Sequence, residues 1–433
     1  MRLKWVVLLV VAAAAFFGGG WLLRRRLREV PAAPRPAVAG VATGRLFTNV
    51  FETVKSFAVD SLDEKALYRM ATLGVLTEVG DPYAALVTGS DSGSVASLGE
   101  PSVQGIYLDQ PEGYVEVVAV VPGSAGELAG VKPGDVILRV NDTRIELQRA
   151  EQVGRMIGGA ETGTVRLRLG RDGGTGPLWV TVVRGPTPER TASGVTAAGG
   201  GVSLVRLTRI DEAAAGLVRR VLDSLKSGAG KGLVLDLRST VDGSLANAIA
   251  VAEQFLDQGQ TVVGHRAKRA VQGEVTRGGQ SAPGTELPVV LLVDRGTAGA
   301  AEVIAGALQD HDRAAVIGET TFGRGASQSL YPLGNGSSLR LTTNLWMTPS
   351  GRVIQRRPPA PLADGTADTA TTRPKFKTDA GRQVLGGGGI VPDREIAVGK
   401  EPSKAEDLAL AAARVLLGRA KDRRTLLAEL DPK

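Results

Sequence analysis

Between residues 190 and 400 the chain alternates short apolar runs with stretches of helical spacing. The apolar runs lie at residues 232–237, 287–293 and 314–318, and the helical stretches at 212–227, 244–258 and 300–309. Short apolar runs separated by helices are typical of strands that are buried on both faces of a parallel sheet with helical crossovers. The sequence therefore predicts an α/β core over residues 190–400.

A different pattern, of short strands and turns, fills residues 98–186. The string Gly-Val-Lys-Pro-Gly-Asp-Val-Ile at residues 130–137 closely resembles the signature of PDZ domains. PDZ domains bind the C-termini of polypeptides by strand addition, beside a loop whose backbone amides hold the carboxylate. The resemblance places that loop at Gly105, Ile106, Tyr107 and Leu108, with Tyr107 where a second glycine is usual. A PDZ domain that only positions or covers the next domain is the alternative.

The N-terminal region contains an uncharged stretch of 19 residues, 5–23, with Trp5 and Trp21 at its ends. This length just crosses a bilayer as a helix, and tryptophan favours the headgroup level. We expect residues 1–28 to form an uncleaved anchor in a bacterial inner membrane, with the body in the periplasm. A cleavable signal peptide is the alternative. Basic residues flank the stretch on both sides, so charge leaves the orientation open.

Three further segments complete the predicted organisation. Residues 29–44 are rich in Ala and Pro and indicate an extended linker. Residues 45–92 have apolar residues at helical spacing and predict two amphipathic helices, with Gly-Asp-Pro at 80–82 as a stop signal. Residues 401–433 predict a C-terminal helix, with Ser403 as its N-cap.

Composition excludes several classes of function. Residues 1–28 hold six basic and no acidic residues, and the rest of the sequence has 46 basic and 45 acidic residues. The net charge of +7 therefore belongs to the N-terminal flank, and no nucleic-acid partner is expected. The sequence has no cysteine, and its two histidines are far apart. Neither a thiol nucleophile nor a metal or other cofactor is expected.

Several strings in the α/β segment occur together in one order. They are Asp-Leu-Arg at 236–238, Ala-Gly-Ala-Leu-Gln-Asp at 305–310, Gly-Glu-Thr-Thr-Phe-Gly at 318–323, Thr-Pro-Ser-Gly-Arg at 348–352 and Gly-Gly-Gly-Gly-Ile at 386–390. With these strings the segment resembles the carboxyl-terminal processing proteases, which are Ser-Lys serine peptidases. The resemblance implies a crotonase-like core with strand-rich parts, behind a PDZ domain and a helical N-terminal segment. It also implies association with a second copy or with an active relative.

The resemblance places the functional positions of the family on five residues. Gly299 stands at the nucleophile position, three residues before a glutamate, and Arg324 stands at the lysine position. The two are 25 residues apart, as the family pattern expects. Gln328 keeps the family's glutamine, and Asp242 and Gly243 lie in the loop that supplies an oxyanion-hole amide.

The two replaced positions remove the chemistry of a Ser-Lys dyad. Glycine has no side chain that attacks a carbonyl, and arginine, with a pKa above about 12, does not release its proton near neutral pH. We therefore expect a pseudoprotease that binds peptide or protein C-termini without cleaving them. The alternative is an active serine endopeptidase with a relocated site, built from Ser327 or Ser329 and activated by Lys268.

Arg324 itself has two interpretations. Its guanidinium pairs structurally with Asp242 or Glu302, or it holds the carboxylate of a bound peptide. The sequence favours the structural pair.

Overall fold

The computed structural model describes most of the protein after residue 38. The described residues are 39–60, 62–88, 104–145, 148–159, 163–171, 176–185, 193–228, 230–241, 243–267, 275–277, 286–334, 336–356, 373–396 and 402–430. They fall into two compact units, Met1–Glu78 and Val79–Lys433.

The first unit contains the two predicted helices, α2 (Ala39–Phe57) and α3 (Glu64–Glu78). Phe51 of α2 is buried and packs on Tyr68 of α3, with ring centroids 4.4 Å apart. Because α2 begins at Ala39, the prediction of an extended linker is wrong for residues 39–44. The last proline of the linker is Pro36, and no residue after it blocks a helix.

The predicted membrane anchor, residues 1–28, and the linker up to residue 38 lie outside the described residues. Within the described part of the protein, no helix combines the length and apolar character that a membrane span requires.

A six-stranded sheet forms the centre of the second unit. Its order is β19-β14-β13-β10-β9-β8, with parallel pairing from β19 to β9 and an antiparallel edge strand β8. The strands are β8 (Gly194–Gly199), β9 (Val202–Arg206), β10 (Gly232–Asp236), β13 (Val289–Val293), β14 (Ala315–Gly318) and β19 (Arg394–Glu395). The three predicted apolar runs form β10, β13 and β14, which confirms the α/β core.

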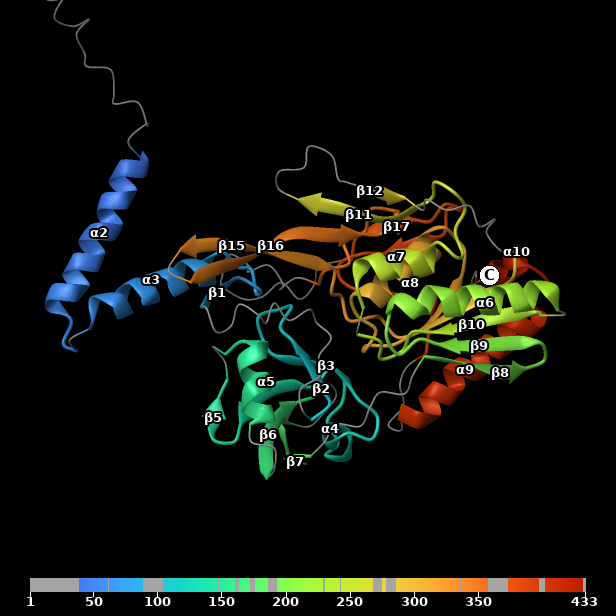
Figure 1. The fold of residues 1–433 in the computed structure, drawn as a ribbon, viewed down its shortest axis with the longest axis horizontal. Coiled ribbons are helices and arrows are strands. Elements are labelled where there is room, and N and C mark those ends of the chain that lie inside the picture. The colour runs from blue at the N-terminus through green and yellow to red at the C-terminus, as the bar shows by residue number, and fades with distance from the viewer. Residues whose placement is uncertain are drawn as a thin grey trace, which may run out of the picture. The chain divides into compact units, whose positions relative to one another are not determined.

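Helices cover both faces of this sheet (Figure 1). One face packs on α6 (Glu212–Ser227), α7 (Leu245–Ala252) and α8 (Ala300–Asp310), and the other on α9 (Pro402–Arg419) and α10 (Arg423–Ala428). Side chains alternate along β10: Leu233 and Leu235 join the first core, and Val234 joins the second. Both faces of the strand are therefore buried, which explains its unbroken apolar sequence.

Two helix predictions differ from the structure in length or number. The helix expected at 244–258 ends at Ala252, because the backbone turns there and buries Phe255 and Leu256 in the core. The C-terminal helix is two helices, since Asp422 caps a new start by accepting a hydrogen bond from the N–H of Thr425. Ser403 is the second residue of α9 rather than its N-cap.

A second sheet of the same unit is antiparallel in all of its described strand pairings. It has the order β1-β16-β11-β12, with β15 pairing along β16. Its strands are β1 (Ala85–Thr88), β11 (Thr261–Ala267), β12 (Val275–Arg277), β15 (Ala326–Gly334) and β16 (Ser337–Met347), and a separate hairpin consists of β17 (Lys375–Lys377) and β18 (Gln383–Leu385). The sequence did not predict this sheet as a unit.

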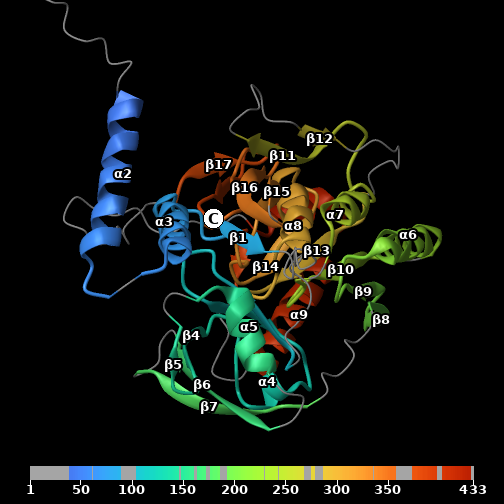
Figure 2. The same cartoon turned by 60° about the vertical axis from the view of Figure 1, so that its left-hand side comes forward.

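The PDZ domain has its own sheet (Figure 2). The strand order of this sheet is β2-β3-β4-β6-β7, and the domain has its own apolar core. Its elements are β2 (Ile106–Asp109), β3 (Glu116–Val120), α4 (Ala125–Leu128), β4 (Val136–Val140), β5 (Thr143–Arg144), α5 (Ala150–Gly158), β6 (Thr164–Gly170) and β7 (Leu178–Val183). In the Pro-Gly-Asp turn, Gly134 has φ +86° and the buried Asp135 accepts the N–H of Lys132. These residues fix the entry into β4.

Candidate active site and PDZ groove

The nucleophile position lies on a sharp turn between β13 and α8. Gly299 is the residue before α8 and has φ 62° and ψ −116°, a backbone conformation that is strained for any residue with a side chain. A strained strand-to-helix turn of this kind presents the nucleophile in many hydrolases. A Cβ atom built at position 299 meets no other atom within 4 Å. The turn therefore leaves open space at position 299, and a side chain there would hold the backbone in a strained conformation.

Glu302 holds this turn against the segment that carries the base position. Its carboxylate accepts the N–H of Gly299 at 3.0 Å, the N–H groups of Gly323 and Arg324 at 2.7 Å each, and the hydroxyl of Thr321. The side chain is fully buried, and burial raises the pKa of Glu302 against the effect of these donors. The Glu302 carboxylate thus joins the backbone of position 299 to the backbone of position 324. The spacing of the two positions therefore does not depend on their own side chains.

Gly243, which the family resemblance assigns to the oxyanion loop, lies against the start of α8. It has φ +154°, and a Cβ atom there would lie 2.5 Å from Cβ of Ile210 and 2.9 Å from Cβ of Ala300. Only glycine fits without displacement. Its neighbour Asp242 lies outside the described residues, so its predicted place in the oxyanion loop stays a prediction.

Arg324 makes a side-chain pair that the sequence did not suggest, and the predicted pair with Asp242 stays a prediction, because Asp242 lies outside the described residues. Nη1 of Arg324 lies 3.4 Å from Oδ2 of Asp109, at the end of the PDZ strand β2. The guanidinium also lies over the ring of Tyr83, 5.8 Å from its centroid, and the side chain is 13% exposed. The predicted pair with Glu302 is wrong, because backbone donors and Thr321 already occupy that carboxylate.

Asp109 is buried and has further partners. The hydroxyl of Tyr83 donates to its Oδ2 at 3.3 Å, and the N–H of Gln110 donates to its Oδ1 at 2.7 Å. Burial raises the pKa of Asp109, and the charge of Arg324 opposes that rise. Arg324 is therefore the cation that balances a buried PDZ carboxylate.

Three other candidate residues lie on strand β15. Gln328 is on β15, and its Nε2 has no hydrogen-bond partner among the described residues. Oγ of Ser327 accepts the indole N–H of Trp346 at 2.8 Å, and Oγ of Ser329 hydrogen-bonds the hydroxyl of Thr343 at 2.8 Å. Neither serine has a basic partner among these bonds.

Thr297 carries the hydroxyl that directly precedes the nucleophile turn in the sequence, and Lys268 is the predicted base of a relocated site. The hydroxyl of Thr297 is fully buried and bonds to the carbonyl of Leu237 and to Asp294, each at 3.0 Å, so it points away from the turn. Lys268 lies outside the described residues.

The loop that is predicted to hold a peptide carboxylate begins at Gly105, whose φ is +76° and where a Cβ atom would lie 2.3 Å from Cβ of Ser124. The following strand, β2, is an edge strand of its sheet, and α5 packs beside it. This is the strand-and-helix groove that receives peptides in PDZ domains. Ile106 is buried in the PDZ core, and Leu108 packs against that core.

Tyr107 has a role that the sequence did not reveal. Its side chain is 2% exposed and belongs to an apolar cluster that joins the PDZ domain to the α/β core. The cluster consists of Tyr107, Val118, Ala119, Val121, Val241, Ala298 and Phe322. The residue that replaces the second glycine thus contributes to docking the domain.

Two more arginines of the core pair with PDZ carboxylates. Nη2 of Arg340 lies 2.6 Å from Oε1 of Glu151, and the guanidinium of Arg356 bonds to Glu116 and lies 3.0 Å from Oε1 of Glu112. Their sequence separation, of 189 residues or more, left no local signal for the pairs with Glu151 and Glu116. Arg324, Arg340 and Arg356 together bridge the two domains.

The fold and the site geometry define a peptidase scaffold with a PDZ domain docked on it. A model of peptidase family S41 matches residues 201–361, and a PDZ-domain model matches residues 116–171. The protein belongs to the S41 peptidase family, among the carboxy-terminal processing proteases.

Individual relatives support this assignment. The carboxy-terminal-processing protease of Bartonella bacilliformis is 32% identical over 318 residues, which cover 71% of this chain and 72% of that protein. The carboxy-terminal processing protease CtpA of Bacillus subtilis is 29% identical over 309 residues, which cover 71% of this chain and 66% of that protein. The solved structure of the photosystem II D1 C-terminal processing protease shares the fold, with a TM-score of 0.61, 23% identity, and coverage of 83% of this chain and 92% of that structure.

Proposed function

We propose that this protein is a pseudoprotease of the carboxy-terminal processing family, which binds peptide or protein C-termini in its PDZ groove without cleaving them. One observation carries the proposal: the elbow at position 299 has open space and no side chain. Position 299 itself offers no nucleophilic atom to a peptide bond. In a comparable serine protease, loss of the nucleophile lowers turnover by about a million-fold.

The environment of Arg324 supports the same conclusion. A lysine base must be neutral near working pH, which requires a tunable amine in a desolvated site. Here the position holds a guanidinium paired with Asp109. The pairing uses the former base position to hold the PDZ domain, so the site supports docking rather than proton transfer.

An active endopeptidase with a relocated site is the competing proposal. Ser327 is its best nucleophile, because it follows Arg324 closely on β15. Its hydroxyl oxygen accepts a hydrogen bond from Trp346, which withdraws electron density, and activation requires a base that accepts its proton. The hydrogen bonds of the described residues supply no such base, so we favour the binding function.

We further propose that the protein is anchored in a bacterial inner membrane by residues 1–28, with a periplasmic body that pairs with a second copy or an active relative. The uncharged stretch at 5–23 supports the anchor. Exposed apolar residues of α2 support the pairing: Phe47, Val50, Val54 and Phe57 recur at steps of three and four and are 39–81% exposed.

A degradation assay with the purified full-length protein tests the proposal. The substrate is an unstructured protein with an apolar C-terminus, and we expect no cleavage. We expect Gly299→Ser combined with Arg324→Lys to give weak proteolysis, and neither change alone to do so. A labelled C-terminal peptide should bind the unmodified protein and lose binding when its carboxylate is amidated. Sedimentation of the same sample measures self-association.

The competing proposal has its own signature in this assay. Cleavage by the unmodified protein that Ser327→Ala abolishes, and that the neighbouring Ser329→Ala leaves intact, would establish a relocated site and overturn the pseudoprotease.

A further inference from the structure

A row of arginines crosses the sheet of the PDZ domain. In the register of β4, β5 and β6, Arg139 lies directly opposite Arg144 on one side and directly opposite Arg168 on the other. On the next strand, β7, Trp179 lies opposite Arg168. Side chains of directly opposite residues lie on the same face, and neighbouring strands are about 4.8 Å apart. Three guanidinium groups and an indole therefore follow one another across four strands.

This row lies on the face of the sheet that points away from the PDZ core. The residues next to the row in sequence, Val140 and Leu167, belong to that core, and successive residues of a strand point to opposite faces. Arg166, two residues before Arg168, shares the outer face. Its Cζ atom lies over the ring of Trp179, 5.5 Å from the centroid, and Trp179 is 48% exposed.

The positive charges of the row are poorly balanced by carboxylates. Of Arg139, Arg166 and Arg168, only Arg166 has a carboxylate partner among the described residues, Asp142, at 3.2 Å. Nη2 of Arg139 donates to the backbone carbonyl of Asp142, and the Nε atoms of Arg139 and Arg168 are buried without a hydrogen-bond partner in the described part of the chain. Like charges that lie directly opposite each other destabilise a sheet, and an unpaired buried donor adds to that cost. An anionic ligand that pairs with these guanidinium groups would relieve both effects.

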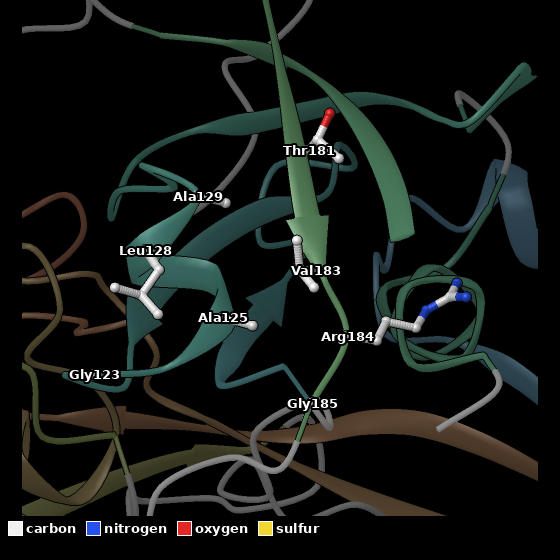
Figure 3. A pocket seen from close by; sticks show the side chains of 8 residues that line it. All are labelled: Gly123, Ala125, Leu128, Ala129, Thr181, Val183, Arg184 and Gly185. Carbon is white, nitrogen blue, oxygen red and sulfur yellow. The ribbon is translucent and has the colours of Figure 1, made fainter. Parts of the chain in front are cut away.

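Exposed apolar side chains border the row at the edge strand. Val183 of β7 is on the same face as Trp179 and is 65% exposed, and Leu128 of helix α4 is 82% exposed. Leu128 and Val183 line one cavity between α4 and β7 (Figure 3). The outer face of the domain therefore combines a basic row with an apolar border.

This combination identifies the kind of anionic partner. Guanidinium groups bind phosphate oxygens in a bidentate way, and tryptophan favours the level of lipid headgroups. Apolar side chains beside cations enter the boundary between headgroups and acyl chains. A soluble acidic polypeptide would neutralise the arginines but would offer no apolar phase to Leu128 and Val183. The surface of an anionic membrane matches both parts of the face.

We propose that the outer face of β4, β6 and β7, with Arg139, Arg166, Arg168 and Trp179, is a membrane-docking surface that binds the headgroups of anionic phospholipids. The proposal does not depend on the peptide groove at β2 or on the state of the catalytic positions. It is also tested separately from the proposed anchor, because the measured quantity is the contact of Trp179 with lipid rather than the attachment of the protein to a vesicle.

The test uses the full-length protein, reconstituted in phosphatidylcholine vesicles that contain brominated acyl chains. Bromine quenches tryptophan fluorescence at short range, and the difference between the unmodified protein and Trp179→Phe isolates the signal of Trp179. We expect quenching of Trp179 when the membrane contains about 30 mol% phosphatidylglycerol, and little quenching without it. Quenching should fall at about 1 M salt, which screens the charges.

Arg139→Gln combined with Arg168→Gln removes two charges of the row and should reduce the quenching of Trp179 about ten-fold at the same lipid composition. This variant should have an equal or higher urea midpoint than the unmodified protein, because the two arginines repel each other. The matched control is Arg220→Gln combined with Arg414→Gln, at exposed positions of α6 and α9, which should leave the quenching unchanged.

Leu128→Asp is a second variant, at an exposed residue outside the row. It places a carboxylate in the apolar border and should also reduce the quenching. Equal quenching with and without phosphatidylglycerol, or equal quenching of the unmodified protein and the Arg139 and Arg168 variant, would overturn the proposal. A lower urea midpoint of that variant would show that the arginines stabilise the fold, which would also overturn it. Protection of Trp179 from iodide by soluble polyglutamate, with no response to phosphatidylglycerol, would assign the face to an acidic polypeptide instead.

Discussion

The single residue Glu302 holds the geometry of this site, although no Ser-Lys dyad is present at positions 299 and 324. We predict that Glu302→Gln destabilises the protein by about 2 kcal/mol, because the amide NH₂ replaces an acceptor and faces backbone donors that are left unpaired in the interior. Urea unfolding measures the change. The control is Glu127→Gln, at an exposed carboxylate that accepts one N–H, where we expect less than about 0.5 kcal/mol. Equal losses of stability in both variants would contradict the role of Glu302 in holding the two segments together.

The sequence predicted some residues of the site and missed others for an identifiable reason. Gly299 and Arg324 were located by short strings, because the turn and the β15 entry are each local. The pair of Arg324 with Asp109 was not predicted, since Asp109 lies 215 residues away and is reached only through domain docking. Glu302 looked available from the sequence, yet its oxygens are occupied by the backbone of residues that fold around it.

At the scale of elements, the arginine bridges determine how firmly the PDZ domain is held. Arg356 pairs with Glu116, whose pKa burial raises. We predict that Arg356→Met destabilises the protein by about 2–3 kcal/mol, because it leaves that buried carboxylate without its cation. It should also speed amide exchange in β3. Arg166→Met is the matched control: its ion pair with Asp142 is exposed, and we expect less than about 1 kcal/mol. Similar losses in both variants would argue against a bridge.

Elements with a strong local signal were predicted well, and elements defined by partners were not. The runs that became β10, β13 and β14 are apolar throughout, because helices cover both faces. The second sheet escaped prediction, since its strands β1, β11 and β16 come from distant parts of the sequence and are only partly buried. The break before α10 depends on one capping residue, Asp422, within an otherwise continuous helical pattern.

For the whole molecule, the pKa shifts of the buried carboxyl groups determine the pH at which the fold is most stable. Burial raises the pKa of Asp109, Glu116, Glu302 and Asp393. These groups hold protons in the folded protein at a pH where the unfolded protein has released them. Their contribution is therefore complete below the ordinary carboxyl pKa of about 4 and is lost as the pH rises through their folded values.

The pKa of Asp236 is shifted in the opposite direction, and this shift limits the stability of the fold at acid pH. Burial would raise the pKa of Asp236, but hydrogen bonds and charge from Arg238, with the charge of Arg206, outweigh it and lower the pKa. Its contribution is present above about pH 4 and is lost as the pH falls through its folded value. We therefore predict a urea midpoint that is higher at about pH 5 than at about pH 7.5. Glu302→Gln removes one of the raised groups and should narrow that difference. An equal urea midpoint at the two pH values, or a higher midpoint at about pH 7.5, would contradict this prediction. It would show that ion pairs affect the carboxyl pKa values more than burial does across the whole molecule.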